Sequence, residues 1–426
     1  MNVDTMRTID RWAGIPLTFL LTCWQRLREL VKRPDVRAPK RILFIELSEM
    51  GSTILVDPAL RKARERLDAE LFFVIFRKNR ASLDLIGTIR AANTFTLRED
   101  SLLHLVVDTL RFLRWTRRQR IDTVVDLELF SRFTALLTGL SGAVNRVGFY
   151  SFHNEGLYRG ELLTHRVAYN PHIHIAKNFI ALVNSLLAET GEVPYSKQVV
   201  DDDEIRLPVI SCSERELDNM HELVRRHCPD YDRHRHRLVL INPNASELLP
   251  QRRWMRDRYE ELIRRILESA PDVLVLITGA PSEKGEAGEM RRRISNPRCV
   301  NFAGALPLAR LPALYSIATL MVTNDSGPGH FSAITPLPTF VLFGPETPAL
   351  YGSLGNSTPI FAGLACSPCV SAANHRKTPC TDNRCLQAIT VDQVFAAIRP
   401  VLLRQGEGCR GSRAAVTPQE RRDEKK

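Results

Sequence analysis

Short apolar runs that end in polar turns recur along the first half of the chain. Such runs cover residues 41–47, 71–76 and 123–127, and a helical pattern of apolar residues covers residues 102–113. A continuous apolar run of this length is typical of a strand that is buried on both faces. Strands that alternate with helices predict a parallel sheet and an α/β fold.

The second half of the chain repeats this pattern more clearly. Apolar runs cover residues 238–242, 273–279, 317–323 and 339–343, and a polar or Gly-Pro turn follows each of them. A doubly wound sheet binds its ligands beyond the carboxyl ends of its strands. We therefore expect the turns after these strands to contribute to one site.

Length and local composition indicate how the chain is divided. With 426 residues, the chain is long enough for two domains of ordinary size and additional tails. Residues 201–236 are highly charged and contain no strand pattern, as expected of an interdomain segment. The predicted units are a leader at residues 1–38, an N-terminal domain at 39–200, the interdomain segment, a C-terminal domain at 237–403 and a disordered tail at 404–426.

The leader contains an apolar run, residues 12–24, with Trp at both ends and Arg26 and Arg28 directly after it. The run is too short to span a bilayer and lacks a small-residue cleavage site. An apolar helix with aromatic ends and basic neighbours fits the interface of an anionic membrane. The alternative is a helix that packs on the protein's own surface. We expect a cytoplasmic protein, with the peripheral inner face of the cytoplasmic membrane as the place where such a leader would act.

The overall charge favours an acidic partner. The formal net charge is +11, which suits nucleic acid, an anionic membrane or a phosphorylated substrate. No module of interleaved basic and aromatic residues is visible, so nucleic acid is not the expected partner.

The turn at residues 325–330, Asp-Ser-Gly-Pro-Gly-His, lies between a predicted strand and a predicted helix. Backbone N–H groups at the start of a helix, together with its dipole, favour a bound anion. Gly327 permits close approach of a phosphate, and Pro328 fits the first helical turn. The alternative interpretation is an ordinary strand-to-helix connection.

This turn, followed by a strand that ends in Leu-Phe-Gly-Pro at residues 342–345, resembles the signature of glycosyltransferase family 9. The resemblance extends from about Arg41 to about Val401. It implies a GT-B architecture, in which two Rossmann-like doubly wound domains face a cleft. It also implies an inverting, metal-independent transfer from a nucleotide sugar, such as ADP-heptose, to a lipopolysaccharide-type or other surface saccharide.

The resemblance also implies which residues bind the donor. The C-terminal domain would hold the nucleotide sugar, and Arg253 would bind its diphosphate, since a guanidinium can bind two oxygens. Surface capping is the alternative for this arginine, and capping of a helix start is the alternative for Glu283. The implied donor residues are Asn244, Ser246, Arg253, Glu283, Asp325, Ser326, Gly327 and His330.

The catalytic base is where the chain departs from the family. Family members carry a Gly-Asp pair after the first strand, whereas this chain has Gly51 and Ser52. A neutral serine is no comparable base at pH 7. Glu49 lies in the same turn and is the expected replacement, and Glu46 is the second candidate.

Four cysteines, Cys366, Cys369, Cys380 and Cys385, lie close together in the sequence. Four thiolates could form a structural zinc site, with His375 as an alternative ligand, or they could remain free or redox-sensitive thiols. No Asp-x-Asp pair follows a strand, and no catalytic metal or required cofactor is expected.

Two other functions remain open from the sequence. A nucleotide-sugar epimerase on the same scaffold would need further acid and base carboxylates. A non-catalytic nucleotide-sugar-binding protein is compatible with Ser52 in place of the aspartate. On the acceptor side, the basic segment at residues 77–80 could contact an acidic acceptor, whereas His172 and His174 are given no role.

Overall fold

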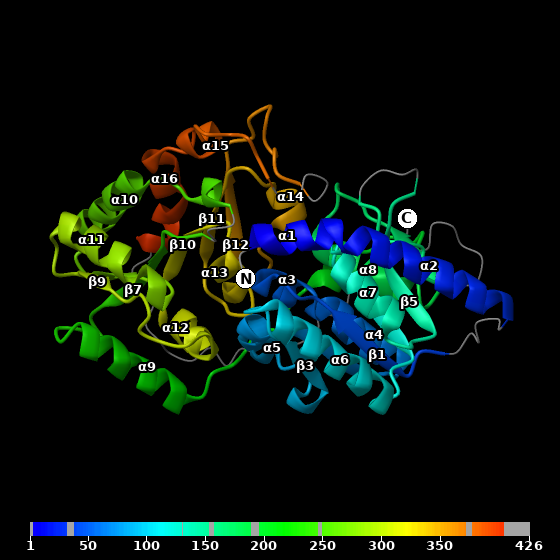
Figure 1. Ribbon diagram of the computed structural model, residues 1–426. Helices are drawn as coiled ribbons and strands as arrows, with labels where there is room; N and C mark the ends of the chain where they lie inside the picture. Colours follow the sequence, from blue (N-terminus) through cyan, green and yellow to red (C-terminus); the bar gives the residue numbers. More distant parts are fainter. Residues whose placement is uncertain are drawn as a thin grey trace, which may run out of the picture.

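Two parallel sheets, one in each half of the chain, organise the computed structural model, which describes residues 3–31, 38–129, 131–152, 157–188, 196–245, 249–371 and 377–403. Figure 1 shows the two halves side by side, with the first sheet at the right. Ser246, His375 and the predicted tail at residues 404–426 lie outside the described residues.

The first sheet has the strand order β3-β2-β1-β4-β5-β6. Its first strand is therefore central, and the chain winds outward in both directions, as in a Rossmann fold. The strands are β1 (Arg41–Ile45), β2 (Glu70–Phe76), β3 (Thr94–Leu97), β4 (Thr123–Asp126), β5 (Asn145–Tyr150) and β6 (His165–Ala168). The helices of this half are α1 (Val3–Trp12), α2 (Gly14–Val31), α3 (Met50–Leu55), α4 (Asp57–Leu67), α5 (Arg80–Ile86), α6 (Leu102–Arg118), α7 (Arg132–Leu140) and α8 (Ile175–Asn184).

The second sheet has the order β12-β11-β10-β7-β8-β9, which is the same winding about its own first strand. The predicted α/β fold with two doubly wound sheets is confirmed. The strands are β7 (Arg237–Asn242), β8 (Val273–Ile277), β9 (Cys299–Asn301), β10 (Leu320–Asn324), β11 (Thr339–Phe343) and β12 (Ser357–Phe361). The helices are α9 (Glu214–His227), α10 (Arg256–Ser269), α11 (Lys284–Ile294), α12 (Leu311–Ile317), α13 (Gly327–Ser332), α14 (Pro348–Tyr351), α15 (Arg384–Gln387) and α16 (Val391–Leu402).

Burial on both faces explains why the central strands are apolar at every position. In β1, Ile42 and Phe44 join one core cluster, whereas Leu43 and Ile45 join the cluster on the opposite face. The same alternation holds in β7, where successive residues contribute to two different clusters. Because side chains alternate across a strand, only a continuous apolar run fills both layers.

The two halves also share buried contacts. Ile54 and Leu85 from the first half belong to a core cluster of the second half, and Leu350 and Tyr351 belong to a cluster of the first. His174, at the start of α8, has its Nε2 atom 2.8 Å from the carbonyl oxygen of Gly352. These contacts fix how the carboxyl ends of the two sheets approach each other.

The predicted leader helix exists as two helices, α1 and α2, that pack against α7 of the N-terminal half. Within the described ranges, no helix is both long enough and apolar enough to cross a membrane.

Candidate active site

The turn at residues 325–330 lies at the carboxyl end of β10, as the sequence predicts. Asp325, at 3% exposure, continues the sheet ladder by donating its backbone N–H to Leu342. The short helix α13 then begins at Gly327 with Pro at its first turn. Ser326 donates its hydroxyl to the Asn324 carbonyl, which fixes the side chain at the head of this helix.

Asn324 holds the neighbouring turns in place. Its Oδ1 atom accepts hydrogen bonds from the Trp254 N–H and the Tyr259 hydroxyl, each at 3.0 Å. Its Nδ2 atom donates to the carbonyls of Pro243 and Asn244, at 2.8 and 3.3 Å. A fully buried amide thus ties the turn after β7 to the end of β10, a role that the apolar strand pattern did not reveal.

The turns after β7 and β8 meet at Gly279. A Cβ atom on Gly279 would lie 3.3 Å from Asn244 Nδ2 and 2.7 Å from Glu283 Oε2. Asn244 is buried, and in the described part of the structure its Nδ2 atom has no hydrogen-bond partner, so it is available as a donor to a ligand. Glu283 accepts a hydrogen bond from the Ala280 N–H at 2.6 Å, which is the capping contact considered from the sequence.

The two arginines after β7 point to different places. Arg253 donates from Nε and Nη2 to the Ala245 carbonyl, at 3.1 and 2.9 Å, and so braces the turn. Arg252 places Nη1 3.7 Å from Asp325 Oδ2 and 3.7 Å from Glu346 Oε2. The structure places Arg252 beside the Asp325 turn, and donor binding by Arg253 stays a prediction.

Asp325 and Glu346 form a buried pair of carboxyl groups beside Arg252. Burial raises the pKa of Glu346 well above its ordinary value, and the adjacent negative charge of Asp325 raises it further. The raised pKa favours the protonated form of Glu346, which can donate a hydrogen bond to Asp325. A hydroxyl group both donates and accepts hydrogen bonds. Arg252 and the protonated form of Glu346 can donate to it, and the Asp325 carboxylate can accept from it.

His330 is buried and interacts electrostatically with Asp325 and Arg252. Burial lowers its pKa to about 4, and the positive charge of Arg252 acts in the same direction, although Asp325 opposes the shift. The imidazole is neutral at pH 7. In the described part of the chain its Nδ1 atom has no hydrogen-bond partner.

The expected base lies on the opposite half, at the start of α3. Glu49 is the residue before α3, and Ser52 donates its hydroxyl to Glu49 Oε2 at 3.0 Å. The turn before it is held by Glu128, whose Oε1 accepts from the N–H groups of Leu47 and Ser48, at 3.1 and 3.2 Å. Ser52 thus orients the neighbouring carboxylate of Glu49.

A close contact joins the two parts of the site. A Cβ atom on Gly51 would lie 2.5 Å from His330 Cδ2, so the first turn of α3 touches α13. Glu49 and Ser52 are therefore close to the Asp325 turn. Glu46 is buried in the first sheet, at 4% exposure, which leaves Glu49 as the more accessible carboxylate.

Several residues of this site escaped the sequence-based prediction. Arg252 was distinguishable from Arg253 only by the direction of its side chain, and Glu128 lies in a turn that carries no motif. Glu346 directly follows the Leu-Phe-Gly-Pro motif, and this position next to the recognised turn was the available signal.

The zinc site considered for the four clustered cysteines stays a prediction, because the alternative ligand His375 lies outside the described residues. Among the described residues, no group of three or more His, Cys, Asp or Glu side chains is arranged to hold a metal ion. Cys380 Sγ lies 3.4 Å from Asp382 Oδ1, and Cys385 Sγ lies 3.3 Å from Asn383 Oδ1. Both thiols thus contact polar side chains of their own loop and of the start of α15.

Solved structures share this architecture. The Escherichia coli ADP-heptose LPS heptosyltransferase II is 19% identical, with a TM-score of 0.66 over 85% of this chain and 99% of that chain. A family 9 glycosyltransferase from Veillonella parvula is 18% identical, with a TM-score of 0.67 over 88% and 100% of the two chains. At this level of identity the likeness establishes the GT-B fold.

Curated relatives match shorter stretches. Lipopolysaccharide heptosyltransferase 2 of Salmonella typhimurium is 27% identical over 124 residues, which is 28% of this chain and 35% of the relative. Lipooligosaccharide heptosyltransferase 2 of Campylobacter jejuni is 24% identical over 170 residues, 39% and 51% of the two chains. The chain thus spans about a third to a half of the length of these relatives.

The family model described as glycosyltransferase family 9 (heptosyltransferase) matches residues 109–378, which is more than half of the chain and includes the whole Asp325 turn. With the two doubly wound sheets and the paired turns at their carboxyl ends, this match shows that the chain belongs to glycosyltransferase family 9.

Proposed function

We propose that this protein is an inverting glycosyltransferase that moves a sugar from a nucleoside-diphosphate donor to a saccharide acceptor without a catalytic metal. The observation that carries the proposal is the contact of Gly51 with His330, which brings a carboxylate of one sheet beside the polar turn of the other. Glycosyl transfer needs a base on one side of the sugar and charge stabilisation on the other.

The C-terminal half binds the donor in this proposal. Arg252 turns from the carboxyl pair to the departing diphosphate and neutralises its charge, as a guanidinium does well. The Asn244 amide and the backbone N–H groups of residues 326–327 donate further hydrogen bonds. Asp325 and Glu346 bind hydroxyls of the transferred sugar, while Glu283 lies on the nucleoside side.

The N-terminal half activates the acceptor. Glu49, oriented by Ser52, removes the proton from the acceptor hydroxyl. The oxygen then attacks the anomeric carbon from the face opposite the diphosphate, so the bond to the diphosphate breaks as the new bond forms. One displacement of this kind inverts the configuration at the anomeric carbon.

The relatives guide the choice of substrates. Their names are those of ADP-heptose and lipopolysaccharide heptosyltransferases, and we accordingly propose ADP-heptose as donor and a lipid-linked, lipopolysaccharide-type saccharide as acceptor. The exposed basic residues Arg77 and Lys78 would face an acidic acceptor. Such an acceptor would be met at the cytoplasmic face of the inner membrane.

Calorimetric titration of the purified chain with ADP, UDP, GDP, CMP and dTDP, with and without a chelator, tests the donor site. Binding of ADP that the chelator leaves unchanged is the expected result. An affinity that falls when the chelator is added would contradict the metal-independent mechanism. Tighter binding of another nucleotide would mean that the donor carries that nucleotide and is not ADP-heptose.

Glu49→Gln tests the chemistry. We expect turnover to fall by about 10²–10⁴-fold with donor affinity retained, because the variant keeps its shape and loses its basicity. Glu286→Gln, at an exposed position on α11, is the matched control and should retain activity. Wild-type donor binding without transfer to any saccharide would instead support the non-catalytic binding protein that Ser52 left open.

A further inference from the structure

The leader helix α2 has its polar and apolar faces reversed relative to an ordinary surface helix. The residues that it buries against the protein are Gly14, Thr18, Leu21 and Gln25. Phe19, Leu20 and Leu27 are 56%, 61% and 65% exposed, whereas Thr18 and Gln25 are 0% and 8% exposed. A helix in water normally turns its apolar face inward. The outer face of α2 therefore suits an apolar environment.

Polar contacts fix this orientation. Gln25 donates from Nε2 to the Gly139 carbonyl at 3.1 Å, and Thr22 Oγ1 accepts from the Glu161 N–H at 3.0 Å. Asp10 of α1 accepts from the Phe133 N–H at 2.9 Å at the start of α7. These bonds hold α1 and α2 with the apolar side of α2 outward, so rotation of α2 would break them.

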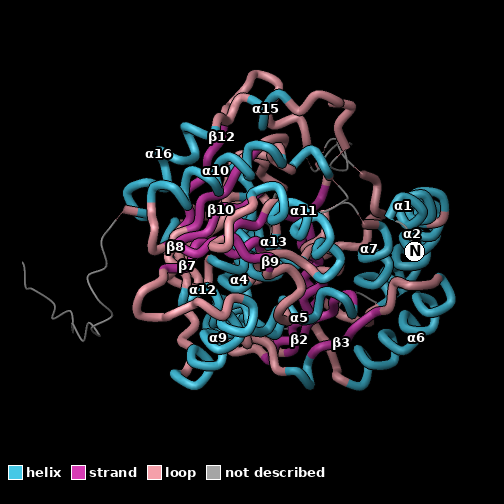
Figure 2. The backbone as a smooth tube through the Cα atoms, turned by 90° about the vertical axis from the view of Figure 1, so that its left-hand side faces the viewer, coloured by secondary structure: helices cyan, strands magenta, loops and turns pink. Residues whose placement is uncertain are grey.

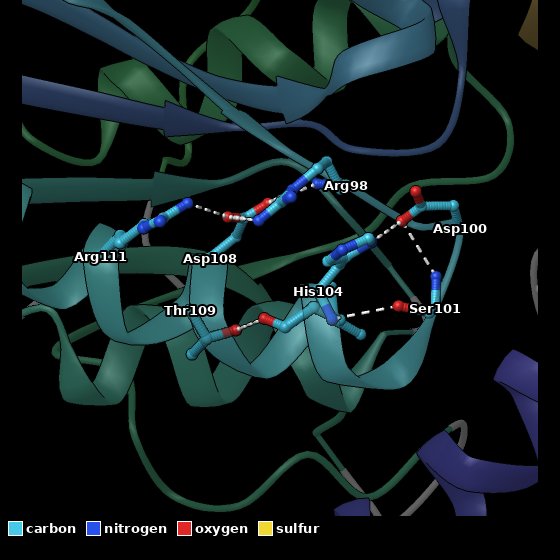
Figure 3. Close-up of polar contacts among 8 residues, drawn as sticks. Arg98, Asp100, Ser101, His104, Asp108, Thr109 and Arg111 are labelled. Carbon is cyan, nitrogen blue, oxygen red and sulfur yellow. Dashed lines mark hydrogen bonds and ion pairs between the residues drawn. The ribbon is translucent and has the colours of Figure 1, made fainter.

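Helix α6 repeats the arrangement. Asp108 is buried and bound by both Nε and Nη2 of Arg98, at 2.8 and 2.7 Å, as Figure 3 shows. Ser101 caps the helix by accepting from the His104 N–H. Meanwhile Leu103 and Leu110 are 72% and 64% exposed. Figure 2 places α1, α2 and α6 along the same side of the molecule.

Basic residues accompany both apolar faces. The guanidinium of Arg28 lies 5.5 Å from the ring centre of Trp24, and that of Arg11 lies 6.0 Å from that of Trp12. Tryptophan prefers the level of lipid headgroups, and arginine binds their phosphates. At the end of α6, an open hollow is lined by Arg111, Arg114, Trp115, Arg118 and Gln119.

We propose that the outer faces of α1, α2 and α6 form a docking surface for an anionic phospholipid bilayer. The apolar side chains enter the acyl boundary, and the arginines bind headgroup phosphates. A symmetric pairing of two copies through this surface would bring like-charged arginines together, which disfavours a second copy as the occupant. The inference extends the proposed function, because an enzyme with a lipid-linked acceptor gains from being held at the membrane.

Vesicle sedimentation of the full chain tests this docking surface in the absence of nucleotide sugar and saccharide. The probes are vesicles of phosphatidylcholine alone and vesicles with about 30% phosphatidylglycerol. We expect binding to the anionic vesicles. Phe19→Ser with Leu20→Ser should weaken that binding about tenfold or more, since both side chains are exposed and contribute apolar area. Arg114→Glu with Arg118→Glu should remove the preference for anionic lipid.

Matched controls change the same residue types elsewhere. Val209→Ser removes an exposed apolar side chain, and Arg215→Glu with Arg226→Glu reverses charges on α9 in the other half. These variants should bind vesicles like the wild type. Absence of wild-type binding, or equal loss in the controls, would overturn the proposal. The proposal would also be overturned if the Phe19→Ser, Leu20→Ser variant bound vesicles normally while a wild-type dimer became monomeric, because the surface would then bind a second copy.

The result is separable from that for the catalytic site. Vesicle binding by a protein that transfers no sugar would sustain the docking surface and count against the proposed activity. Sugar transfer to a water-soluble acceptor by a protein that binds no vesicles would support the proposed activity and count against the docking surface.

Discussion

Gly51 and His330 touch across the boundary between the two sheets, and only the missing side chain of Gly51 permits the contact. A Cβ atom there would lie 2.5 Å from His330 Cδ2, well inside van der Waals distance, and His330 is buried. The position therefore couples the turn that carries the proposed base to the turn that carries the proposed donor site.

Gly51→Ala should lower the free energy of unfolding by about 1–3 kcal/mol, because the imidazole or α3 must move to admit a methyl group. It should also reduce turnover, since the move separates Glu49 from the Asp325 turn. Urea denaturation and a transfer assay measure the two effects. Gly285→Ala on α11 is the control, where no atom lies within 4 Å and the variant should gain about 0.5–1 kcal/mol. Unchanged stability in Gly51→Ala would show that the contact does not exist in solution.

Arg252→Met should weaken nucleoside-diphosphate binding by about 10- to 100-fold, as expected for a lost charge-assisted bond, and affect the nucleoside alone little. Arg253→Met should disturb the turn through Ala245, with a smaller effect on the diphosphate. Calorimetry with the diphosphate and the nucleoside separates the two arginines. A larger loss of diphosphate affinity in the Arg253 variant would support the assignment made from the sequence and contradict the role proposed for Arg252.

The buried imidazole of His330 predicts a pH dependence of stability. Its pKa falls from 6.5 to about 4 on folding, so the unfolded chain binds the extra proton between these values. The contribution of His330 to the free energy of unfolding is therefore fully present above pH 6.5. It is lost as the pH falls toward 4, which lowers the free energy of unfolding by about 3 kcal/mol in total. His330→Gln should show a correspondingly smaller loss when urea denaturation is compared at pH 7 and pH 4.5. If the free energy of unfolding fell equally with pH in the wild type and in His330→Gln, the pH dependence would not come from His330.

Asn324→Leu should destabilise the protein by about 3 kcal/mol or more, because it leaves the Trp254 N–H, the Tyr259 hydroxyl and two buried carbonyls without their partner. Donor affinity should fall with it, since the turn after β7 loses its attachment to β10. Asn356→Leu, at an exposed position with one bond to Pro336, should change stability by less than about 0.5 kcal/mol. Similar effects of the two substitutions would argue against the role of Asn324.

The sequence determined the central strands, because strands buried on both faces must be apolar at nearly every position. Residues 339–343 form β11 as predicted, and residues 273–277 of the predicted run form β8. The outer strands gave no such signal. β12 contains Pro359 and exposed residues, and β5 begins with Asn145 and Arg146, since a strand near an edge or beside a loop tolerates polar groups.

The sequence also determined the polar turn at residues 325–330, whose Gly and Pro encode a local change from strand to helix. Tertiary structure alone decided which side chains meet there. Arg252 and Arg253 are adjacent and chemically identical, and packing sends one to Asp325 and the other to the Ala245 carbonyl. The raised pKa of Glu346, the contact of Gly51 with His330 and the reversed faces of α2 all depend on segments distant in the chain. Local sequence fixes backbone preference, whereas burial and charge environment arise only when separate elements are packed together.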